Sequence, residues 1–142
     1  MLKSLDMLVQ MSIMTSFNKR FFLTLLFSTL LFGDIATKYA EGLTKAIQTN
    51  KKLFILVYDT KSTQARNYYD RLTNDEDLLM KLSHHYQLVI LDKNSEQFPK
   101  RYLTKYPITT FLITPPSEIE DEMILGAVNP IKLLRIAVPT EF

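Results

Sequence analysis

The stretch Leu53-Phe54-Ile55-Leu56-Val57-Tyr58-Asp59-Thr60-Lys61 decides the fold, because a continuous apolar run passes directly into a polar turn. An apolar run of this kind suits a strand that is buried on both faces, as in the sheet of an α/β protein. Asp59-Thr60-Lys61 is a turn whose hydroxyl and carboxylate groups can cap the helix that runs through Ala65 to Leu72. The stretch therefore predicts a buried strand, a turn and a helix.

Helices and strands alternate along the rest of the chain from residue 35 onward. Apolar residues at helical spacing, capping residues and further apolar runs predict these elements. No repeat, low-complexity tract or internal linker interrupts them, so residues 34–142 are expected to form one domain. Further helices are predicted over 35–49, from Asn74 or Asp75 to about 84, over 96–103 and after Asn129-Pro130, and further strands over 86–92, over 108–113 and after an acidic turn within 118–125.

The composition is that of a globular protein. The 142 residues are 46% hydrophobic and 23% charged, which fits a folded chain rather than a disordered one. Three of the 17 basic residues and one of the 15 acidic residues precede Asp34, which leaves 14 of each sign from Asp34 onward. A nucleic-acid partner calls for a basic face, so this neutral balance argues against one.

A basic patch followed by an apolar run stands near the N-terminus. Asn18-Lys19-Arg20 precedes Phe21 to Phe32, a run of uncharged and mostly apolar residues in the order of a secretory signal peptide. An apolar helix of that length spans about 18 Å, well short of a hydrocarbon core of about 30 Å. Residues 1–33 are therefore expected to be a signal peptide of a periplasmic or secreted protein. An uncleaved anchor, which would tether the protein to the inner membrane through Phe21 to Phe32, and a buried helix are the alternatives.

The chain contains no cysteine, which excludes disulfides and thiolate metal sites within it. His84-His85 does not form a convincing metal site either, because adjacent helical residues point about 100° apart and no third ligand joins them. The run from Glu118 to Glu122 lacks the spacing of a Ca²⁺ loop. No metal and no cofactor are expected; the histidines are expected to end a helix and the acidic run to form a solvated turn.

Three segments of the chain resemble the thioredoxin-like family. Ala46 to Val57 resembles the helix, lysine-rich turn and strand that introduce the redox motif in secreted thioredoxin-like proteins. Leu72 to Leu78 is similar to the break between the active-site helix and its successor, and Tyr106 to Pro115 looks like the family's cis-proline followed by a strand. The resemblance implies a thioredoxin-like three-layer α/β sandwich with a central mixed sheet of four to five strands.

The resemblance places the family's CxxC motif on Ser62-Thr63-Gln64-Ala65. Thiol chemistry needs one thiolate to attack a disulfide and a second thiol to resolve the mixed intermediate, so dithiol–disulfide oxidoreductase activity is excluded. Lys61 stands where the family usually has an aromatic residue, and the family's buried carboxylate falls near Leu56. These further departures favour natural divergence over an engineered replacement of two thiols.

By the same resemblance, Pro107 is the cis-proline and lies against the Ser62 to Ala65 turn. Cis geometry exposes the backbone of Tyr106, so that an extended peptide can pair with it. The resemblance therefore implies a redox-inactive domain that binds a protein or peptide partner. The residues expected to contact the partner are the degenerate motif Ser62, Thr63, Gln64 and Ala65 together with Lys61, Tyr106, Pro107 and Ile108.

Two other functions stay open. An enzyme of different chemistry could use Ser62 as a nucleophile or hold a thiol cofactor at this helix end, which requires a buried base near Ser62. Without such a base, Ser62 is expected to cap the helix. A membrane-tethered structural module would result if Phe21 to Phe32 is never cleaved. Among Tyr58, Tyr68, Tyr69, Tyr106 and Phe111, at least half are expected in the core, and Tyr106 is expected to face solvent.

Overall fold

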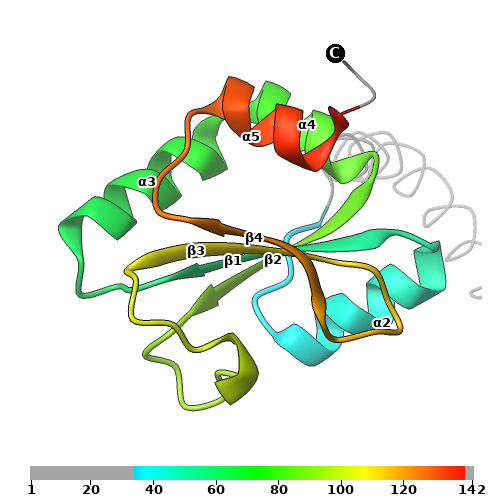
Figure 1. The fold of residues 1–142 in the computed structure, drawn as a ribbon, viewed down its shortest axis with the longest axis horizontal. Helices are drawn as coiled ribbons and strands as arrows, with labels where there is room; N and C mark the ends of the chain where they lie inside the picture. Colours follow the sequence, from blue (N-terminus) through cyan, green and yellow to red (C-terminus); the bar gives the residue numbers. More distant parts are fainter. Residues whose placement is uncertain (1–33, 140–142) are drawn as a thin grey trace, which may run out of the picture. The chain divides into compact units, whose positions relative to one another are not determined.

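The computed structural model describes residues 34–139, drawn in colour in Figure 1. The signal peptide or anchor expected over residues 1–33 lies outside the described residues. None of the described helices has the length and apolar character needed to cross a membrane. The elements in chain order are α2 (Tyr39–Thr49), β1 (Lys52–Tyr58), α3 (Thr63–Asn74), α4 (Glu76–Ser83), β2 (Tyr86–Asp92), the 3₁₀ turn η1 (Lys100–Tyr102), β3 (Ile108–Ile113), β4 (Glu120–Leu125) and α5 (Pro130–Ala137).

The strands form a mixed four-stranded sheet in the order β2-β1-β3-β4. β1 and β2 are parallel, with Phe54 opposite Leu88, whereas β3 runs antiparallel to β1 and β4 antiparallel to β3. An isolated parallel bridge between Ala36 and Val89 extends the sheet beyond β2. The predicted α/β fold with a central mixed sheet is therefore confirmed.

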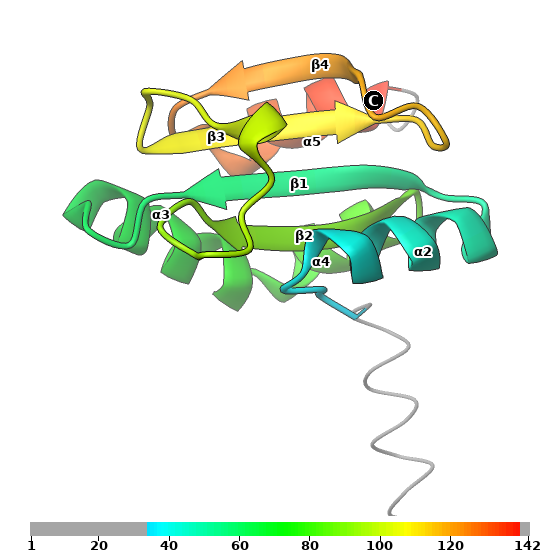
Figure 2. The ribbon, with the colours of Figure 1, turned by 90° about the horizontal axis from the view of Figure 1, so that it is seen from below.

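Helices cover both faces of the sheet. Figures 1 and 2 show α3, α4 and α5 on one face and α2 with the η1 segment on the other. Side chains alternate along β1, so Phe54 and Leu56 join the core under α3, α4 and α5, whereas Leu53, Ile55 and Val57 join the core against α2. Because both faces are covered, β1 is apolar at each position from Leu53 to Tyr58, and the domain is a three-layer sandwich.

Capping side chains mark where the helices begin. The Ser62 hydroxyl accepts a hydrogen bond from the Ala65 N–H at 3.2 Å, and Asn129 caps α5 by accepting from the Lys132 N–H at 2.8 Å. Such caps satisfy N–H groups that have no partner inside the helix. The predicted cap at Ser62 is therefore confirmed, and a helix opens after Asn129 as predicted.

Two predicted helices are shorter than expected. The helix predicted from Ile35 begins only at Tyr39, because Ala36 is held at the sheet edge by backbone hydrogen bonds to Leu88 and Ile90. The helix predicted over 96–103 is the single turn η1, which follows Pro99. Proline has no N–H and keeps the residue before it out of helical geometry, so a helix does not continue through this position.

Candidate functional site

The degenerate motif lies at the start of α3, with Ser62 as the N-cap and Thr63, Gln64 and Ala65 in the first turn of the helix. Thr63 and Gln64 are exposed, and Ala65 is fully buried at the base of α3. The Ser62 hydroxyl is the N-cap of α3 and accepts the N–H of Ala65. The motif therefore lies at a strand-to-helix turn, as the resemblance implies, and Ser62 performs the capping role expected in the absence of a base.

Beneath this turn the core is apolar. Leu56 is fully buried in the same cluster as Ala65, at the strand position where the family's carboxylate was expected to fall. No cluster of three or more His, Cys, Asp or Glu side chains suited to a metal ion occurs among residues 34–139. The motif turn thus presents neither a thiol nor a buried carboxylate below it.

A polar network joins the ends of β1 and β2 beside the motif. The Asp59 carboxylate accepts hydrogen bonds from the Lys61 N–H at 2.9 Å and from Asn94 Nδ2 at 2.7 Å. The bond from Asn94 is the main cause that lowers the pKa of Asp59 below its ordinary value of 3.8. The Thr60 hydroxyl lies 3.2 Å from both carboxylate oxygens of Asp92. These bonds order the two loops and leave the carboxylates occupied.

The expectation that Pro107 follows a cis peptide bond is wrong. Within residues 34–139 the cis peptide bond is the one between Pro115 and Pro116, so the bond from Tyr106 to Pro107 is trans. The Pro107 carbonyl accepts the Asp59 N–H at 2.8 Å, which ties this segment to the end of β1. Trans is the favoured isomer of an X–Pro bond by about 0.5–1 kcal/mol, and the local sequence alone does not overcome that preference.

The other predicted binding residues are divided between surface and core. Lys61 is exposed, and Tyr106 retains 39% of its surface, so the prediction that Tyr106 faces solvent is confirmed. Pro107 is half-buried. Ile108 is fully buried in the core under α3, α4 and α5, so its side chain is not available to a partner.

The remaining aromatic residues near the motif mostly support the core. Tyr68 and Phe111 are buried, in agreement with the expectation that at least half of the set is core. Tyr58 and Tyr69 are half-buried and stack on each other, with ring centroids 4.8 Å apart and an interplanar angle of 17°. This pair lies at the end of β1 and on α3; both residues were named from the sequence, but their stacking was not predicted.

Exposed apolar side chains stand on the edge strand β4 and in the segment that leads into β3. Met123 and Leu125 each keep 45% of their surface exposed, and Leu103 keeps 58%. We call Leu103, Tyr106, Met123 and Leu125 the β4 strip. The sequence did not reveal it, because the acidic residues at the start of β4 predicted a solvated turn there.

Cross-strand pairing places Met123 and Leu125 on the same face of the sheet as Phe111 and Thr109 of β3. Leu125 lies opposite Thr109 in the β3–β4 ladder. The Thr109 hydroxyl is 2.8 Å from the hydroxyl of Thr104, which stands between Leu103 and Tyr106 in the chain. The only helical element between β2 and β3 is η1, which is three residues long.

The acidic run before β4 is partly structural. Glu118 accepts a hydrogen bond from the Tyr39 hydroxyl at 2.6 Å and forms an ion pair with Arg101 at 2.5 Å. The Tyr102 hydroxyl donates to that of Tyr39 at 3.2 Å. The bond from Tyr39 lowers the pKa of Glu118, and burial is the main cause that raises the pKa of Tyr39. Glu118 therefore joins α2, η1 and the β3–β4 loop rather than standing free in solvent.

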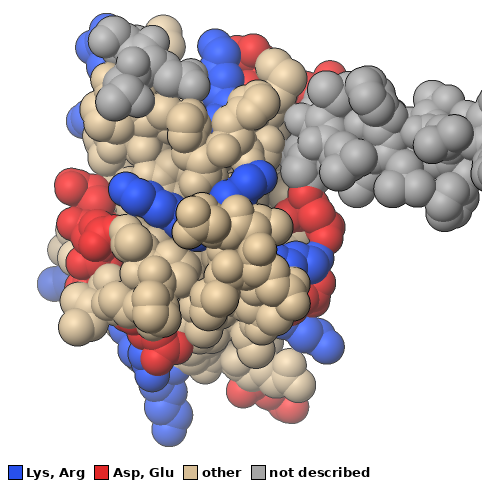
Figure 3. Space-filling view, turned by 90° about the vertical axis from the view of Figure 1, so that its right-hand side faces the viewer, with Lys and Arg blue, Asp and Glu red and all other residues tan. Residues whose placement is uncertain are grey.

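Charge is mixed on the end of the domain seen in Figure 3, where acidic and basic side chains are interspersed among uncharged ones.

His84 is the C-cap residue of α4, so the helix ends where the sequence predicted.

Comparison with known proteins supports the fold and no more specific relationship. No protein family model matches the sequence, and no curated protein shows significant sequence similarity to it. Among solved structures, a redox protein from Chlamydomonas reinhardtii superposes with a TM-score of 0.57 at 18% sequence identity. The match covers 74% of this chain and 36% of that protein, so the chain spans about a third of its length. At this identity the likeness supports a thioredoxin-like α/β fold and says nothing about activity.

Proposed function

We propose that this chain is a redox-inactive, thioredoxin-like protein that binds an extended segment of a partner protein along β4 and the β4 strip. The observation that carries the proposal is that β4 is an edge strand with no further strand paired to it among residues 34–139, and that it bears exposed apolar side chains. The proposal keeps Tyr106 as a binding residue. It does not use the cis-proline argument, which the trans bond before Pro107 removes.

The chemistry at the motif supports the redox-inactive part of this proposal. The whole chain lacks cysteine, and Ser62 uses its hydroxyl to cap α3. Leu56 below the motif supplies no proton-transferring group. Disulfide exchange requires a thiolate, so the motif turn is assigned a structural role.

The backbone of β4 is arranged to accept another strand. The Gly126 N–H donates to the Ile108 carbonyl at 2.9 Å, which sets the alternation of paired and unpaired residues in this antiparallel ladder. Counting back along β4, the N–H and C=O groups of Met123 and Leu125 point away from β3, toward the open edge. Extended peptides bind proteins by adding a strand to such an edge, and apolar side chains beside it supply contact area.

The charges beside the edge indicate the chemistry of the partner segment. Glu120, Asp121 and Glu122 are exposed at the start of β4. A segment that pairs with β4 would place alternate side chains against the β4 strip and others near these carboxylates. We therefore expect a partner segment in which apolar residues alternate with lysine or arginine.

A peptide-display selection tests this function. Random peptides selected on the full chain are expected to share an alternation of apolar and basic residues. Binding should be lost in Met123→Asp and Leu125→Asp, which place a charge on the β4 strip, and retained in Ile131→Asp. Ile131 is the matched control because it is an exposed apolar residue, 62% accessible, on α5. Equal binding by the control and by both strip variants would refute the proposal.

An extracytoplasmic location is part of the same proposal, and it rests on the basic and apolar order of residues 18–32. N-terminal sequencing of the mature protein and a secretion-dependent reporter fused after residue 142 test it. A cytoplasmic reporter signal with an intact N-terminus would contradict it, and an intact N-terminus with an exported reporter would indicate the membrane-tethered alternative.

A further inference from the structure

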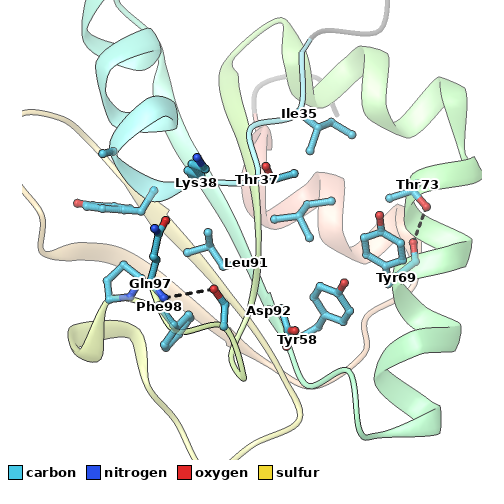
Figure 4. Close-up of a pocket in the computed structure, with 15 residues that line it drawn as sticks. Ile35, Thr37, Lys38, Tyr58, Tyr69, Thr73, Leu91, Asp92, Gln97 and Phe98 are labelled. Carbon is cyan, nitrogen blue, oxygen red and sulfur yellow. Dashed lines mark hydrogen bonds between the residues drawn. The ribbon is translucent and has the colours of Figure 1, made fainter.

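A cavity of about 730 Å³ opens at the carboxyl end of β2, outside both the motif turn and the β4 strip. It lies where residues 35–40 cross the edge of β2, between α3 and the loop that precedes η1 (Figure 4). Its volume falls within the range of about 300–1,000 Å³ that small-molecule sites occupy. Nothing in the proposed peptide binding uses this space.

Aromatic and aliphatic side chains form most of the cavity wall. Tyr58 and Tyr69, stacked at 4.8 Å, stand together on one side of β2, and Phe98 stands on the other (Figure 4). Ile35 and Ile90 add aliphatic surface. Rings prefer offset-stacked or edge-to-face contacts with other rings, so this wall suits a planar aromatic group.

The sheet edge inside the cavity has hydrogen-bonding groups to offer. The Ile90 N–H donates to the Ala36 carbonyl at 2.9 Å, so the backbone groups of every second residue of β2 face outward. By this alternation the Ile90 carbonyl and the Asp92 N–H also face outward. Neither has a backbone partner among residues 34–139. A ligand with a polar group can therefore be oriented at this edge.

Two side chains of opposite charge, Asp92 and Lys38, line the cavity, and they differ in whether their polar atoms already have partners. The Asp92 carboxylate already accepts from the Thr60 hydroxyl, from the Asn94 N–H at 3.0 Å and from Asn94 Nδ2 at 3.2 Å. Lys38, which also lines the cavity, makes no side-chain hydrogen bond or ion pair with any residue in the described range. Its ammonium group is thus the charge left to be paired by a ligand.

From these contacts we propose that the cavity binds a small aromatic acid, with its ring against the Tyr58–Tyr69 pair and its acidic group beside Lys38. Two related dyes distinguish the contribution of the rings to binding from that of the acidic group. 1-Anilinonaphthalene-8-sulfonate carries an anionic group, and N-phenyl-1-naphthylamine has nearly the same rings without it. Fluorescence titration of the full chain with each dye is expected to report binding at the cavity.

Variants of the full chain distinguish the two parts of the site. Lys38→Met is expected to weaken binding of the sulfonate dye by about fivefold, as for loss of an exposed ion pair, and to change binding of the neutral dye less than twofold. Lys132→Met, which removes an exposed lysine of α5, is the matched control and should change neither. Tyr69→Leu is expected to weaken both dyes, with folding checked by circular dichroism.

The proposal fails if Lys38→Met and Tyr69→Leu both bind the two dyes as the parent chain does, because the fluorescence then arises elsewhere. It also fails if Lys38→Met weakens both dyes equally, because the acid would have no specific partner. Should Tyr69→Leu not fold, Lys38→Met alone still decides, since this lysine is exposed. Met123→Asp, which is expected to abolish peptide binding, should leave both dye titrations unchanged. The dye-binding and peptide-binding proposals can therefore fail independently of each other.

Discussion

Replacing Gly42 with alanine is predicted to destabilise the domain, although alanine is the better helix former. Gly42 is buried in α2, and a Cβ placed on it would lie 2.2 Å from Cγ2 of Val89 in β2. Val89 is fully buried and bridges to Ala36, and its β-branched side chain has little rotamer freedom. The overlap can be relieved only by moving α2 away from the sheet.

The expected change in the free energy of unfolding is the sum of two opposing contributions. Alanine in place of glycine favours a helix interior by about 1 kcal/mol. Overpacking a dense core costs about 1–3 kcal/mol. Because the new Cβ would approach Val89 Cγ2 to 2.2 Å, we expect a cost of about 3 kcal/mol or more here. We expect Gly42→Ala to lower the free energy of unfolding by about 2 kcal/mol, which for a domain of this size lowers the thermal midpoint by about 10 °C.

Urea unfolding followed by far-UV circular dichroism measures this cost, and Val89→Ala tests its cause. Val89→Ala removes the methyl group that Gly42→Ala would meet, so the cost of Gly42→Ala should fall by about 1–2 kcal/mol in that background. The reasoning is refuted if Gly42→Ala is as stable as the parent protein. It is also refuted if the cost is the same with and without the Val89 side chain.

Three further predictions concern single polar contacts. Ser62→Ala should lower the free energy of urea unfolding by about 1 kcal/mol through loss of the cap, and leave selected peptides bound as before; unchanged stability would contradict the capping role. Tyr86→Phe removes a buried 2.6 Å bond to the Ala137 carbonyl and should cost about 1–2 kcal/mol in the same assay, whereas a neutral result would mean the bond adds nothing. The bond from Tyr39 lowers the folded pKa of Glu118 below its ordinary 4.5, so its contribution is present above that pH and is lost as pH falls through the folded value. Glu118→Gln should therefore destabilise the protein at neutral pH and converge with the parent protein in acid, and a constant difference across pH would contradict this.

The central strands were predictable because their signal is local. The apolar runs over 53–58, 86–91 and 108–113 coincide with β1, β2 and β3 within a residue or two, since a strand covered on both faces must be apolar at successive positions. The cap at Ser62 was predictable for the same reason, because a capping hydroxyl and its N–H partner lie three residues apart.

The candidate surfaces were harder to predict, since they depend on residues far apart in the sequence. The β4 strip combines residues 103 and 106, which precede β3, with residues 123 and 125, which pair with β3. The cavity combines Ile35 and Lys38 with Tyr69 and Phe98, which no motif or spacing relates. The isomer at Pro107 was misassigned because the resemblance supplied the cis bond, whereas the bond before Pro107 is trans.

By itself, the sequence determined the α/β class, the alternation of elements, the absence of thiol chemistry and the helix cap at Ser62. These properties depend on residue identity and on neighbours within a few positions. Only the tertiary structure decided which edge of the sheet is open, that η1 is a single three-residue turn, and that the crossing of residues 35–40 over β2 leaves a cavity. Those features arise from where segments distant in the chain pack, and the same local patterns are compatible with other packings.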